Sequence, residues 1–139
     1  MFKKIVLAFK FSQACRAVLE KALQLSIEQD AELLIFHALD YRLNVDEKQN
    51  STSSIINQEM KEKFETELKP HLDDFPKVKF DYLPTDPGME ICKIARRTKA
   101  DLILVGCHER PGKQSISRLD YVGITIFENA PCPVMLVPP

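Results

Sequence analysis

Five short apolar runs divide the chain, and segments with helical periodicity separate most of them. The first run, Lys3–Phe9, shows no polar alternation, which is typical of a strand buried on both faces. The other four runs are Ala31–Leu39, Val78–Leu83, Leu102–Val105 and Val134–Val137. Strands that alternate with helices predict a parallel sheet with right-handed crossovers and helices on both faces. The sequence therefore predicts a three-layer α/β fold.

Four helices are predicted between these strands, at about 12–29, 56–72, 86–99 and 118–129. The first has Ser12 as a capping residue, and the second shows apolar residues at every fourth position with Pro70 near its end. The third begins with a capping aspartate, Asp86, and a proline at the first helical position. The stretch Asp40–Ser54 is polar and has no periodicity, so we expect a loop there.

Length and composition indicate one ordinary domain over residues 1–139, because 45% of the residues are hydrophobic and 28% are charged. The formal net charge of −1 provides no field that would attract nucleic acid or an anionic membrane. The apolar runs are too short for a signal peptide or a membrane span. The cysteines form no C-x-x-C pair, which favours reduced thiols. We therefore expect a cytoplasmic protein without nucleic-acid partners or membrane insertion.

The carboxyl ends of the predicted strands are where such a sheet binds ligands. Lys10 follows the first strand, Ala38 lies near the end of the second, and Gly106 ends the fourth. The sequence therefore predicts a binding site at this edge.

Several motifs together resemble one protein family. The opening K-K-I-V-L-A-F-K-F-S, the segment L-I-F-H-A-L-D, the pair D-P-G-M-E-I-C-K-I-A and A-D-L-I-L-V-G, and the closing A-P-C-P-V-M-L-V are similar to universal stress proteins over nearly the whole chain. The resemblance implies a Rossmann-like five-stranded sheet in the order 3-2-1-4-5. It also implies a homodimer through the free edge of the last strand, Val134–Val137.

The same resemblance implies a phosphate loop that is altered in this chain. Members that bind ATP carry Gly-x2-Gly-x9-Gly followed by Ser or Thr, since glycines let backbone N–H groups approach phosphates. Gly106 matches the first glycine and Gly112 another loop glycine, whereas Glu109 takes the place of the second. The pair Asp120 and Tyr121 matches the final Gly-Ser pair. Two carboxylates therefore occupy positions that face a triphosphate in the family.

Three further positions complete the implied pocket. The first-strand aspartate of the nucleotide-binding members is Lys10 here, Ala38 matches the adenine side, and His108 lies at the rim. We hypothesise that Lys10 pairs with Asp120 or Glu109 and fills the pocket from within. Like charges a few ångströms apart repel by on the order of 1 to 4 kcal/mol, so ATP in the family pose is expected to bind weakly.

Two alternatives remain open at this site. The charged residues can be ordinary surface side chains, or a nucleotide can bind in another pose. In the second case the phosphate contacts would come from three basic residues, Arg110, Lys113 and Arg118.

Metal binding and nucleophilic catalysis are weaker hypotheses. Cys107, His108 and His37 lack the close spacing of metal ligands, and no acid is positioned to orient a Cys–His pair. We therefore predict no metal, no catalytic residue and no resident cofactor, with ATP or AMP as possible ligands. The predicted function is non-catalytic regulatory binding in the stress response, with nucleotide sensing as the alternative and slow nucleotide hydrolysis third.

Overall fold

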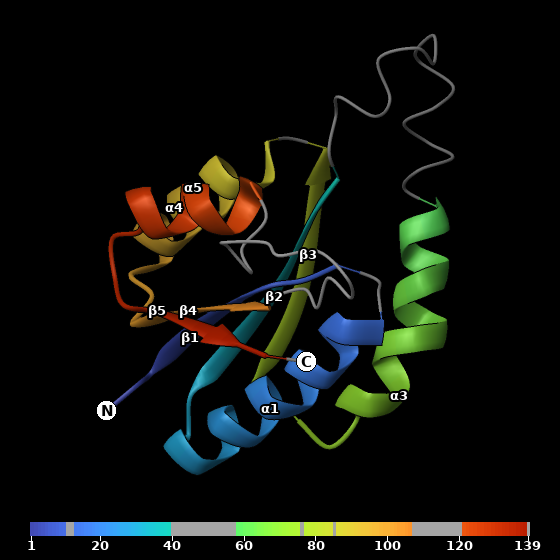
Figure 1. Cartoon of the computed structure of the whole chain (residues 1–139). Coiled ribbons are helices and arrows are strands. Elements are labelled where there is room, and N and C mark those ends of the chain that lie inside the picture. Colours follow the sequence, from blue (N-terminus) through green and yellow to red (C-terminus); the bar gives the residue numbers. More distant parts are fainter. Residues whose placement is uncertain (11–12, 40–57, 76, 85, 107–120, 139) are drawn as a thin grey trace, which may run out of the picture.

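The fold is a single parallel sheet between two helical layers. The structure is a computed structural model and describes residues 1–10, 13–39, 58–75, 77–84, 86–106 and 121–138. The strands are β1 (Lys4–Ala8), β2 (Glu32–Leu39), β3 (Val78–Pro84), β4 (Leu102–Gly106) and β5 (Val134–Val137). They lie in the order β3-β2-β1-β4-β5, and all four pairings are parallel (Figure 1). The predicted fold class and strand order are confirmed.

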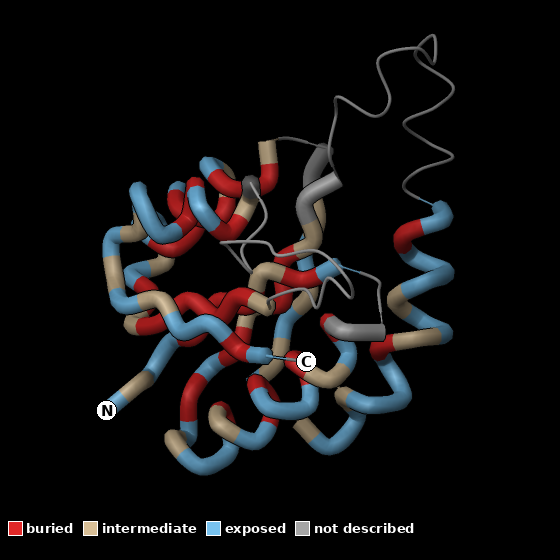
Figure 2. The backbone as a smooth tube through the Cα atoms, viewed as in Figure 1, coloured by how far each residue is buried: buried red, intermediate tan, exposed pale blue. Residues whose placement is uncertain are grey.

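One face of the sheet is covered by α1 (Gln13–Gln29), the π-helical turn η2 (Phe64–Leu68) and the short α3 (Lys69–Leu72). The other face is covered by α4 (Pro87–Thr98) and α5 (Tyr121–Asn129). Figure 2 shows that the buried residues are concentrated in the strands and on the sides of the helices that face them. Each covered face carries its own apolar cluster, so two cores share one sheet.

Strand β1 lies at the centre and contributes to both cores. Ile5 and Leu7 pack under α1, while Val6 packs under α4 and α5. All three are 1% exposed, which confirms the prediction that this strand is buried on both faces.

Helix α4 begins and ends as its sequence predicts. The Asp86 side chain accepts a hydrogen bond from the Met89 N–H at 3.4 Å, and Pro87 lies in the first helical turn. Lys99 ends the helix in the left-handed conformation with φ of 56°. The helix packs closely on α5: a Cβ atom added to Gly88 would lie only 2.7 Å from Thr125 Cβ.

The second helical segment is less regular than its apolar spacing suggests. Residues 58–63 are α-helical, and the chain then widens into η2 before Pro70. The Lys69 N–H bonds to the carbonyl of Phe64, five residues back. Pro70 lacks an N–H and its ring crowds the carbonyl of Thr66, so a regular α-helical turn is disfavoured there. The expected disturbance near Pro70 thus takes the form of a π-helical turn.

The two edge strands differ in how their outer backbone groups are protected. On β3, the Asp81 carboxylate accepts the Tyr82 N–H at 2.8 Å, and Pro84 has no N–H to offer. On β5, Met135 is 41% exposed and Leu136 is 36% exposed. Edge β3 therefore offers fewer N–H groups to a further strand, whereas β5 presents an apolar edge.

No helix in the described part of the chain is long and apolar enough to cross a membrane.

Candidate functional site

The carboxyl ends of β1, β2 and β4 meet at one edge of the sheet. Ala8 is level with Phe36 on one side and with Val105 on the other. The Phe9 N–H then donates to the Phe36 carbonyl at 2.9 Å and extends the β1–β2 pairing by one residue. This edge is where the sequence predicts a ligand site.

Three of the predicted site residues lie at this edge. Lys10 is exposed and follows β1 directly, Ala38 lies in β2 opposite Leu83, and Gly106 is the last residue of β4. Tyr121 is the first residue of α5. The remaining predicted site residues lie outside the described residues: His108, Glu109, Gly112 and Asp120. The proposed pairing of Lys10 with Glu109 or Asp120 therefore lies outside them as well.

Packing favours glycine at position 106, apart from any role in ligand binding. A Cβ atom there would lie 3.1 Å from Val18 Cγ2 and 3.9 Å from Cys15 Sγ, both on α1. Val18 is 1% exposed and has little room to move. The glycine therefore lets the end of β4 pack directly against α1, independently of its match to a phosphate-loop glycine.

His37 is held at the same edge by a backbone contact. Its Nδ1 lies 2.9 Å from the Phe9 carbonyl oxygen, and because a carbonyl only accepts, Nδ1 carries the hydrogen. Burial lowers the pKa of His37; the hydrogen bond to Phe9 opposes this shift, whereas the positive charges of Lys63 and Lys10 add to it. A neutral imidazole beside two lysines is the resulting arrangement.

His37 is also one of the three residues of the metal hypothesis. The weak metal hypothesis joined it to Cys107 and His108, which lie outside the described residues. Among the residues that the structure does describe, no three His, Cys, Asp or Glu side chains form a group that could hold a metal ion. The contact of His37 with Phe9 links the ends of β1 and β2.

Lys63 is a residue at this edge that the sequence does not reveal. It lies at the end of the helical residues 58–63, and its charge acts on His37. The neighbouring Phe64 is one of the apolar residues that recur at every fourth position of the second predicted helix. In the sequence, Lys63 therefore has the pattern of an ordinary solvent-exposed helix residue.

Comparison with known proteins shows similarity to one family over nearly the whole chain. The model of the Universal stress protein family matches residues 1–138. Universal stress protein MJ0531 of Methanocaldococcus jannaschii is 28% identical over 141 aligned residues, which cover 99% of this chain and 82% of that protein.

Solved structures agree with this relationship. The structure of hypothetical protein MJ0577 superimposes with a TM-score of 0.81 at 28% identity and covers 100% of this chain and 97% of its own. The universal stress protein from Archaeoglobus fulgidus in complex with dAMP has a TM-score of 0.67 at 17% identity, covering 98% of this chain and 97% of its own. The match over residues 1–138, on a five-stranded sheet in the order β3-β2-β1-β4-β5, shows that this chain belongs to the universal stress protein family.

Proposed function

We propose that this universal stress protein is a non-catalytic regulatory binding protein whose altered phosphate loop disfavours ATP in the family pose. The observation that carries the proposal is the position of Lys10, exposed directly after β1 and close enough for its charge to act on His37. The family resemblance implies an aspartate at this position in nucleotide-binding members. A cation here changes the charge pattern that a ribose and a metal-bound triphosphate would meet.

The two carboxylates of the loop also lower the expected affinity for ATP. Glu109 and Asp120 stand in sequence where the family motif has glycines. Glycine allows backbone N–H groups to approach a phosphate, whereas a carboxylate adds repulsion and bulk. Loss of donors and gain of negative charge together explain the expected weak affinity for ATP.

Calorimetric titration of ATP with Mg²⁺ tests this proposal. We expect no saturable heat at micromolar ATP for the wild type, and at least about tenfold tighter binding for Glu109→Gly/Asp120→Gly, which restores the glycines. The matched control is Asp73→Gly/Asp74→Gly, which removes two carboxylates from the turn after α3 and is expected to leave the titration unchanged. Micromolar ATP binding by the wild type would contradict the proposal.

A nucleotide-sensing role is the second candidate, and the dAMP complex of the Archaeoglobus fulgidus relative is the observation that favours it. A monophosphate is shorter than a triphosphate and need not reach the altered loop positions. Arg110, Lys113 and Arg118 would supply its phosphate contacts in this alternative. Ultraviolet absorbance and mass spectrometry of small molecules released from the purified protein distinguish the two candidates, and phosphate release from ATP measures hydrolysis.

We also propose that the protein forms a homodimer through β5. The exposed Met135 and Leu136 on this edge support the proposal, as does the pairing pattern. The Ile103 N–H bonds to the Pro133 carbonyl, so along β5 the N–H and C=O of Leu136 point away from β4. Pairing with a second copy would satisfy these groups.

A further inference from the structure

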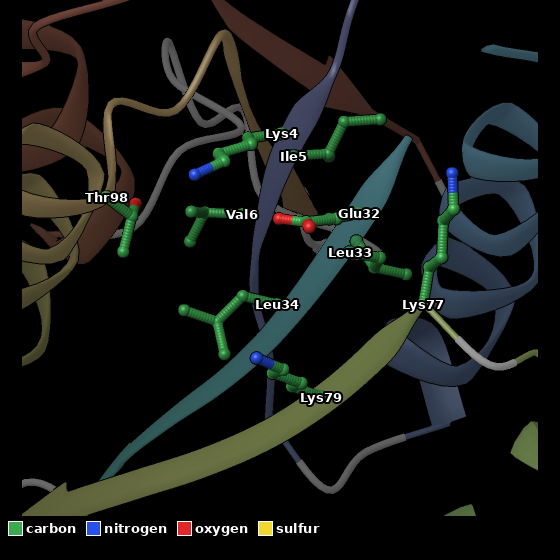
Figure 3. A pocket seen from close by; sticks show the side chains of 9 residues that line it. All are labelled: Lys4, Ile5, Val6, Glu32, Leu33, Leu34, Lys77, Lys79 and Thr98. Carbon is green, nitrogen blue, oxygen red and sulfur yellow. The ribbon is translucent and has the colours of Figure 1, made fainter. Parts of the chain in front are cut away.

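A groove lies at the opposite end of the sheet from Lys10, near the amino ends of β1, β2 and β3. Its volume is about 310 Å³, within the range of small-molecule sites. Six side chains that line it share the α4 side of the sheet in Figure 3: Lys4, Val6, Glu32, Leu34, Lys79 and Thr98. We call these residues the amino-end groove.

The groove exists because α4 covers this face incompletely. Thr98 is the last residue of α4, and Leu34 on β2 is only partly buried against the core beneath that helix. The strand register places Val6, Leu34 and Lys79 side by side across three strands. Leu34 therefore forms the accessible part of the apolar floor, above the buried Val6, and the Lys79 ammonium group lies at its β3 end.

The charges around this floor are not neutralised by one another. Lys77 also lines the hollow, but its Nζ bonds Asp30 Oδ1 at 2.8 Å and points to the other face in Figure 3. Within the described chain, neither Lys4 nor Lys79 takes part in an ion pair, and Glu32 has none either. Two ammonium groups and one carboxylate leave the amino-end groove with a net charge of +1.

We propose that the amino-end groove binds a small aliphatic carboxylate, at a site separate from the one predicted at the carboxyl ends of the strands. Leu34, which is only partly buried, packs against the aliphatic chain, and Lys79 beside it binds the carboxylate, while Lys4 adds positive charge at the β1 end of the groove. The single net positive charge matches one carboxylate better than a polyphosphate. The floor offers aliphatic side chains and no aromatic ring on which a base could stack. The proposal thus goes beyond the function proposed for the opposite edge.

Titration with sodium octanoate, followed by NMR at the methyl groups of Val6 and Leu34, tests the site. We expect saturable shifts at these methyl groups and roughly tenfold weaker binding of hexanoate, since two buried methylenes are lost. Octanol, which has the chain without the charge, is expected to bind at least about fivefold more weakly than octanoate. Absence of saturable shifts with millimolar octanoate, or equal binding of octanol, overturns the proposal.

Charge variants locate the carboxylate. Lys79→Glu is expected to weaken octanoate binding at least about tenfold, whereas Glu32→Gln is expected to tighten it severalfold by removing the repelling carboxylate. A gain of affinity cannot result from unfolding. The matched control is Lys61→Glu, an exposed lysine on the helix of the opposite face, with an expected change below twofold. Equal effects of Lys79→Glu and Lys61→Glu, or no gain with Glu32→Gln, overturn the assignment.

Discussion

At the scale of single residues, His37 couples the end of β2 to the end of β1, and its burial favours the neutral imidazole. Its Nδ1–H donates to the Phe9 carbonyl, and Phe9 itself is 2% exposed. Burial holds the pKa of His37 below its ordinary value, so the folded protein takes up this proton less readily than the unfolded chain does. The side chain therefore makes the stability of this edge sensitive to acid.

We predict that His37→Gln reduces the loss of stability on acidification. Because the folded pKa lies below the unfolded value of about 6.5, the wild type loses stability as pH falls through 6.5 towards the folded pKa. The contribution of neutral His37 is complete above this window. Urea unfolding at a series of pH values measures the difference. His71→Gln, which changes an exposed histidine, is the control; a variant curve parallel to the wild type would contradict the assignment.

At the scale of secondary-structure elements, the contact between α4 and α5 shows why one glycine is required. Gly88 is buried in the first turn of α4, directly against Thr125 of α5, and Cys92 one turn later lies with its Sγ 3.9 Å from the Ile126 carbonyl. The two helices approach so closely that a methyl group does not fit between them. They therefore cover their face of the sheet as one layer.

Gly88→Ala is predicted to destabilise the protein by about 1–3 kcal/mol, although alanine is the better helix former. The added Cβ would lie 2.7 Å from Thr125 Cβ and 2.8 Å from its Cγ2, so α4 must shift away from α5. Equilibrium urea unfolding provides the measurement. Lys93→Ala, at an exposed position of α4, serves as control and is expected to change stability by less than about 0.5 kcal/mol. A more stable Gly88→Ala variant would disprove this packing argument.

The sequence is most informative about elements whose signals are local. The Asp86-Pro87 start of α4, the central strand β1 and the strand order implied by the family resemblance all appear as expected. The π-helical turn is harder to predict from the sequence, because apolar residues at every fourth position favour a regular helix.

Contacts between residues distant in sequence have no local signal. The Asp101 carboxylate accepts the backbone N–H groups of Lys3 and Lys4 at 2.6 and 2.9 Å, which lowers the pKa of Asp101. The effect of Lys63 on His37 is of the same kind. Neither contact can be inferred before the strands are placed, and the loop residues Glu109 and Asp120 of the predicted site stay predictions.

At the scale of the whole molecule, the proposed dimer depends on the apolar edge of β5. We predict that the wild type sediments at about twice the 15.9 kDa mass of the chain and that Leu136→Lys sediments as a monomer. In a twofold pair the new charges of the two copies would lie close together and repel each other. Ile27→Lys, at a 58% exposed site on α1, is the control and should leave the dimer intact. A monomeric wild type, or a dimeric Leu136→Lys variant, contradicts the β5 interface.

The unequal edges of the sheet also limit how far such an assembly can grow. A pair joined through β5 would have only the two β3 strands at its outer ends, where Asp81 already occupies the Tyr82 N–H and Pro84 has none. A third molecule would find fewer backbone N–H groups to pair with on β3. Growth of the proposed dimer into fibres through its outer strands is therefore disfavoured.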